Sequence, residues 1–118
     1  MTKHEDTPYL QHIAEAIRNI ESFSENLTKE KFLKNSLRQS AIVRQLEIIG
    51  EAAKNVSENT RKKHPQVVWK DIAGTRDKII HHYFGVNLNI IWDIIKKDLP
   101  DSREIRHRQS QTGGLLAH

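Results

Sequence analysis

The chain contains no cysteine, which excludes disulfide frameworks, thiolate zinc sites and cysteine nucleophiles. It also lacks a glycine-rich nucleotide loop and an acidic metal cluster. No apolar run is long enough to span a bilayer, and the segment from Met1 to Asp6 lacks the apolar core of a signal peptide. These absences fit a reducing compartment, and we expect a cytoplasmic protein without a membrane anchor.

The length and charge of the chain set broad limits on what it does. Its 118 residues suit a single domain whose core is large enough to fold without disulfides or a structural metal ion. Lysine and arginine number 19 against 15 acidic residues, which gives a formal net charge of +4. This excess favours a polyanionic partner such as a nucleic acid, but a solvated basic surface explains it equally well.

Apolar residues recur at helical spacing in four segments, which predicts an all-α fold. The first helix is expected from Pro8 to Ser24, and a short helical piece follows Thr28, a suitable N-cap. The longest helix is expected from Ser36 to Val56, where two apolar stripes exceed what one packed face requires. Such a helix either contacts a second subunit or is buried on both sides within its own bundle.

In the second half of the chain, polar and glycine-containing stretches are expected to separate the helices. Residues 57 to 65 are expected to form a loop, after which Val67 to Ile72 anchors the chain on the core. Gly74 is expected to interrupt the backbone and Thr75 to cap a helix from residue 76 to 84. A last helix begins at Asn87 and ends before residue 100. Residues 1–100 then form the domain, and residues 101–118 a flexible basic tail.

One segment, from Gly74 to Gly85, has residue types that suit phosphate chemistry. Arg76 supplies a planar cationic fork for phosphate oxygens, and His81 supplies a group that exchanges protons near neutral pH. Tyr83 adds a hydroxyl group. The segment is the strongest candidate for a functional site in the sequence.

Structural roles for the same residues are also open. Arg76 could pair with a surface acid, and Asp77 suits the positive end of a helix. His81 and His82 could be satisfied polar residues, and their adjacency on a helix disfavours a shared metal ion. Residues five apart on a straight helix are separated by about 140°, so Arg76 and His81 need a bend or a second subunit to meet.

The motif and its surroundings resemble a known family. Arg76, His81 and Tyr83 form an Arg-x4-His-x-Tyr pattern, preceded by a Leu-Glu-Ile-Ile-Gly-Glu-Ala block from Leu46 to Ala52 and followed by Asp-Leu-Pro ending at Pro100. Together they are similar to the HepT-like toxins of the HEPN superfamily, over residues 9 to 99. The resemblance implies an antiparallel four-helix bundle with a short extra helix, assembled as a homodimer that cleaves RNA without metal or other cofactor.

The resemblance also implies roles for individual residues. The catalytic residues would be Arg76 and His81, and supporting roles would fall to Asp77, His82 and Glu51. The partner would be a nucleotidyltransferase antitoxin that attaches AMP to Tyr83, in a type VII toxin–antitoxin system. An alternative is a non-catalytic accessory subunit that binds substrate or nucleotide for a nucleotidyltransferase. A plain dimerisation bundle would explain the helices but would leave the motif without a use.

Overall fold

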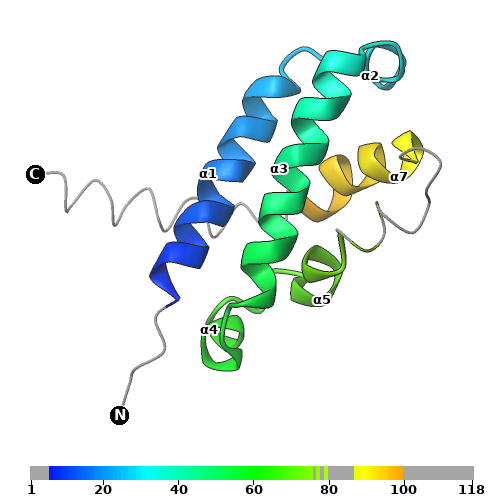
Figure 1. The fold of residues 1–118 in the computed structure, drawn as a ribbon. Helices are drawn as coiled ribbons and strands as arrows, with labels where there is room; N and C mark the ends of the chain where they lie inside the picture. Colours follow the sequence, from blue (N-terminus) through cyan, green and yellow to red (C-terminus); the bar gives the residue numbers. More distant parts are fainter. Residues whose placement is uncertain (1–5, 76, 78, 80–86, 100–118) are drawn as a thin grey trace, which may run out of the picture.

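The computed structural model describes residues 6–75, 77, 79 and 87–99 of the chain. Over these residues every regular element is helical, which confirms the all-α class. Figure 1 shows two long neighbouring helices, α1 and α3, with shorter helices at their ends and beside them. None of the described helices is long and apolar enough to cross a membrane.

The long helices α1 (Thr7–Phe23) and α3 (Ser36–Lys54) run antiparallel and pack along their length. They begin and end close to the expected positions. The turn after α1 includes Asn26, whose φ of 57° lies in the left-handed region that asparagine tolerates. The short helix α2 (Lys29–Leu33) follows, capped as expected by the Thr28 side chain, which accepts a hydrogen bond from the Lys31 amide at 3.2 Å.

Residues 57 to 65 were expected to form a loop, and this prediction is wrong. A helix, α4 (Glu58–Lys63), occupies most of the stretch and ends before the proline. The Ser57 hydroxyl caps it by accepting from the Thr60 amide at 3.2 Å. An acid in the first turn and bases in the last turn suit the helix dipole. No residue of α4 is buried, so an apolar pattern could not reveal it.

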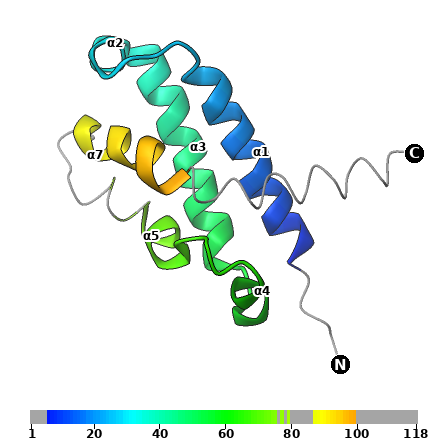
Figure 2. The same ribbon diagram turned by 180° about the vertical axis from the view of Figure 1, so that it is seen from behind.

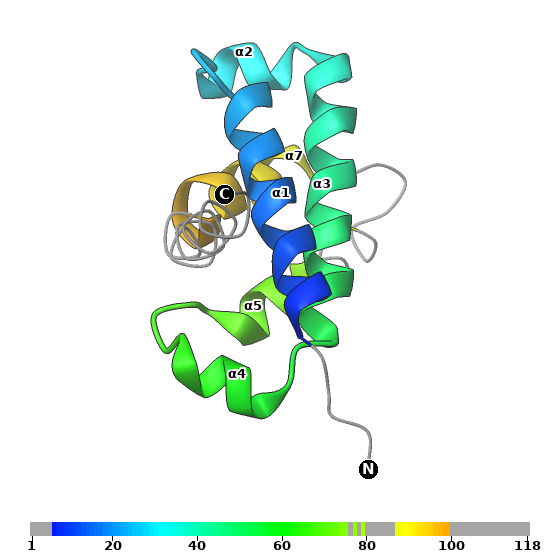
Figure 3. The ribbon, with the colours of Figure 1, turned by 90° about the vertical axis from the view of Figure 1, so that its left-hand side faces the viewer.

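The remaining helices cover one side of the α1–α3 pair. These are α5 (Trp69–Ala73) and α7 (Leu88–Asp93), the latter continuing as the π-helix η1 (Ile94–Asp98). Figure 2 shows α5 and α7 beside α3, and Figure 3 shows that α7 lies on one side of the α1–α3 layer. Asn87 caps α7 as expected, with its side chain accepting from the amides of Asn89 and Ile90.

The core lies between the α1–α3 layer and these shorter helices. Ile13, Ile17, Ile42 and Ile91 are 0% exposed and come from α1, α3 and α7. Leu88 and Trp92 are half-buried at the edge of this core. The Trp92 ring lies 5.5 Å from the Phe32 ring, and the Lys96 ammonium group lies 4.7 Å from its centroid.

Candidate functional site

Most of the residues predicted to act on substrate lie outside the described part of the chain. These are Arg76, His81, His82 and Tyr83. The segment that leads into them is described, and so are two supporting candidates, Asp77 and Glu51. The structure therefore shows how the start of the motif segment is held on the core.

The chain approaches the motif from an anchored α4–α5 corner. Trp69, at the start of α5, is buried, and its indole N–H donates to the His64 carbonyl at 3.1 Å. The Arg61 guanidinium lies 5.8 Å from the centroid of the same indole ring and donates to the Ala53 carbonyl at 2.8 Å. Because Ala53 belongs to α3, these contacts fix the beginning of α5 against the end of the long helix.

The helix α5 ends at Ala73, and Gly74 interrupts the backbone as expected. A Cβ atom at Gly74 would lie 3.2 Å from the Lys70 carbonyl oxygen, closer than most such contacts. Thr75 was expected to cap the next helix, and this stays a prediction because that helix includes residues outside the described part of the chain. The Thr75 hydroxyl donates backward to the Asp71 carbonyl at 3.1 Å, as threonines within helical turns often do. Thr75 is only 2% exposed, so its side chain lies on the buried side of this turn.

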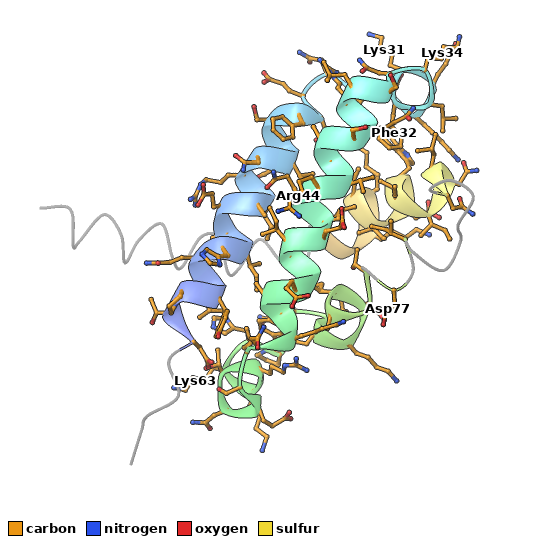
Figure 4. All side chains as sticks on the ribbon, viewed as in Figure 1. Lys31, Phe32, Lys34, Arg44, Lys63 and Asp77 are labelled. Carbon is orange, nitrogen blue, oxygen red and sulfur yellow. The ribbon has the colours of Figure 1, made fainter. Side chains whose placement is uncertain are left out.

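Beyond Thr75, the described residues indicate which side of the segment faces the core. Thr75, Asp77 and Ile79 have helical backbone, with Ile79 buried and Asp77 exposed. Figure 4 shows the Asp77 side chain between α5 and α7, on the side of α3 away from α1. The Asp77 carboxylate is therefore exposed where the motif segment begins.

Glu51 lies elsewhere on the surface, in a groove between α1 and α3. The groove has a volume of about 460 Å³, and Asp77 is not among the residues that line it. The sequence analysis did not predict this polar groove. The regular spacing of charged residues along α3 is the signal that could have indicated it. The lining residues are Tyr9, His12, Arg44, Glu47, Ile48, Glu51, Ala52 and Asn55.

Comparisons with known proteins decide the family. The model of the family described as ribonuclease HepT-like matches residues 13–108, which is most of the chain and includes the motif. The chain belongs to the HepT-like ribonuclease family. This confirms the resemblance drawn from the motif and its flanking blocks. No solved structure matches the chain.

Named relatives of the HepT-like family agree with this assignment. A protein of Methanocaldococcus jannaschii, named as a candidate RNase, is 46% identical over 106 residues, covering 89% of this chain and 88% of the relative. A probable ribonuclease HepT of Thermococcus cleftensis is 45% identical, covering 82% and 86%. A candidate RNase of Caldanaerobacter subterraneus is 48% identical, covering 80% and 84%. The ribonuclease names of these relatives support an RNA-cleaving enzyme.

Proposed function

We propose that this HepT-like protein is a cytoplasmic, metal-independent endoribonuclease, the toxin of a type VII toxin–antitoxin pair. The observation that carries the proposal is the family match, because it spans the Arg-x4-His-x-Tyr motif and the relatives across the same region are named RNases. The anchored turn at Thr75 supports it, since the segment is held to the core where the motif begins.

The proposed chemistry uses side chains of the motif alone. An imidazole of His81 removes the proton from a ribose 2′-hydroxyl, whose oxygen attacks the adjacent phosphorus. The bond from phosphorus to the 5′-oxygen breaks, and an imidazolium protonates that leaving oxygen. Arg76 stabilises the negative charge on the phosphoryl oxygens in the transition state. His82 is the competing candidate for the base.

Two acidic residues have supporting roles in this proposal. Asp77, which is exposed at the start of the motif segment, orients Arg76 or His81 rather than acting as a base. Glu51 is exposed in the groove between α1 and α3, so it would support the site only of a second copy of the chain. The active unit is a homodimer, in which a second copy of the motif supplies the histidine that Arg76 does not face on its own helix.

The activity is tested by cleavage of RNA with purified protein produced without its neighbouring nucleotidyltransferase. Arg76→Ala and His81→Ala should each lower the rate by roughly 10²- to 10³-fold with the fold intact, and His82→Ala should have a smaller effect. Cleavage should persist in EDTA. Activity that vanished with chelator and returned with Mg²⁺ would contradict the mechanism. Binding of RNA without cleavage by the unmodified wild type would instead identify an accessory subunit.

A further inference from the structure

The positive charge of the chain is concentrated at one end of the molecule. Residues 54–73, which run from the last residue of α3 through α4 and α5, contain five basic and two acidic side chains. Their net charge of +3 is most of the +4 of the whole chain. Figure 1 shows α4 and α5 together at the same end of α3, and residues 54–73 are called the basic corner below. Its cations are Lys54, Arg61, Lys62, Lys63 and Lys70.

Four of these cations are exposed and have no partner of opposite charge in the described part of the chain. They are Lys54, Lys62, Lys63 and Lys70. Among the described residues, their ammonium groups form neither an ion pair nor a hydrogen bond. Lys34 differs, because its ammonium group lies 3.3 Å from the Glu30 carboxylate. Figure 4 shows Lys63 at the α4 end of α3, and Lys31 and Lys34 at the opposite end.

The helix α4 holds its lysines on a backbone that is fixed at both ends. No residue of α4 is buried, so the helix adds no side chain to the apolar core. The Asp6 carboxylate accepts hydrogen bonds from its first turn, and the Arg61 guanidinium in its last turn donates to the Ala53 carbonyl of α3. These polar contacts place Lys62 and Lys63 on an ordered surface. Charges that are ordered in advance lose less entropy when a ligand binds.

The basic corner leads directly into the segment that carries the motif. The carbonyl of His64, the C-cap of α4, accepts from the Trp69 indole at 3.1 Å, so α4 ends beside the start of α5. From Trp69 to Thr75 the chain advances by about 9 Å at the rise of a helix. Single-strand binding surfaces cover about 4–16 nucleotides. One strand of such length therefore reaches from the motif segment across the basic corner.

The basic corner has groups that bind phosphate and none that stack on a base. Lysine ammonium groups bind phosphates as point charges. Trp69 is the only phenylalanine, tyrosine or tryptophan among residues 54–73, and it is only 8% exposed. A base therefore finds no aromatic ring on which to stack here. An acidic protein would attract the same lysines, but the continuity with a segment proposed to cleave RNA favours a polynucleotide.

We propose that the basic corner binds the sugar-phosphate backbone of the RNA substrate, a few nucleotides away from the bond that is cleaved. The proposal rests on the ribonuclease activity of the proposed function and assigns a place to the rest of the strand. Lys62 and Lys63 are positioning residues, because they act on the affinity for RNA and not on the chemical step. Their contacts add affinity for RNA of any sequence.

The test is the double variant Lys62→Gln and Lys63→Gln, which removes two charges from a helix with no buried residue. Loss of two phosphate contacts should lower the slope of log affinity against log salt by about 1.4 and weaken binding roughly tenfold at about 0.15 M salt. Fluorescence anisotropy with a non-cleavable 2′-O-methyl RNA of about 30 nucleotides, longer than such binding sites, measures both values. In cleavage of the matching unmodified RNA, KM should rise roughly tenfold at an unchanged kcat. A dinucleotide, too short to reach the basic corner, should be cleaved as by the wild type.

Two matched double variants separate local contact from other effects. Lys62→Arg with Lys63→Arg keeps both charges and should bind RNA like the wild type. Lys29→Gln with Lys31→Gln removes the same charge from exposed positions of α2, at the far end of α3. It should change the affinity by less than about twofold, because charges farther from the strand than the Debye length of about 8 Å are screened.

Each failure has its own signature. Equal losses for the α2 and α4 variants, an unchanged salt slope in the α4 variant, or slower cleavage of the dinucleotide would overturn the role of the basic corner. So would weaker binding of the neighbouring nucleotidyltransferase at an unchanged affinity for RNA, which would assign the lysines to a protein partner. A wild type that binds RNA with the expected salt dependence but does not cleave it would overturn the ribonuclease assignment and keep the surface. A wild type that binds no RNA overturns both.

Discussion

At the scale of single residues, the candidate site is a set of three side chains within one short segment of the chain. Arg76, His81 and Tyr83 stand out because few side chains bind phosphate or exchange protons near neutral pH. Their placement lies outside the described residues. Thr75, just before them, is described: it is 2% exposed and its hydroxyl donates to the Asp71 carbonyl of α5 at 3.1 Å.

Tyr83→Phe separates toxicity from its regulation. The substitution keeps the aromatic ring and removes only the oxygen that would accept AMP, so the variant should still cleave RNA and inhibit growth. It should also resist an active antitoxin, because no bulky phosphate can be attached beside the arginine that receives the substrate. Incubation with the neighbouring nucleotidyltransferase and ATP, followed by peptide mass spectrometry, measures the modification. Adenylylation found only at another residue would refute the assignment of Tyr83.

At the scale of elements, helices with an apolar stripe were predicted closely and the one without a stripe was missed. Thr28 and Asn87 cap α2 and α7 as expected. Capping is a local interaction, because the side chain accepts a hydrogen bond from a backbone amide only two or three residues later. The exposed helix α4 has polar and charged residues on every side. It depends on Ser57 and on the Asp6 carboxylate, which accepts hydrogen bonds from the Ser57 amide at 3.2 Å and from the Thr60 hydroxyl.

Ser57→Ala should therefore destabilise the protein through α4. The loss of an N-cap hydroxyl costs about 0.5–2 kcal/mol of unfolding free energy, and the Ser57 hydroxyl also donates to Asp6 at 2.5 Å. Urea denaturation measures the change. Ser40→Ala is the matched control, because Ser40 is exposed within α3 and should change stability by less than about 0.5 kcal/mol. Equal stabilities for the two variants would show that the cap contributes nothing.

At the scale of the whole molecule, a few buried side chains join the short helices to the long pair. Phe32 is 0% exposed and connects α2 to α7 through its contact with Trp92. The side chains of Ile72 and Ile79, one on each side of the Gly74 turn, are both buried in the core. Packing of this kind fixes how the segment entering the motif meets the core, although no single element would be stable alone.

Phe32→Ala should lower the free energy of unfolding by about 3–5 kcal/mol, because it removes a fully buried aromatic ring and leaves a cavity. That is a large part of the total stability of a domain of this size. Leu37→Ala is the matched control, because Leu37 is 79% exposed, and in the monomer it should have almost no effect. Thermal unfolding at low protein concentration compares them. Similar losses for both variants would mean that Leu37 is covered within a single chain.

The sequence by itself determined the helical class, the boundaries of the amphipathic helices and the family, because periodicity, caps and the motif depend on residues close together in the chain. The tertiary structure decided the existence of α4 and the groove between α1 and α3. Asp6 contacts Ser57 across fifty-one positions, and the groove joins residues of two helices. Contacts between distant residues leave no periodic pattern in a sequence, so only the folded chain brings Arg44, Glu51 and His12 onto one surface.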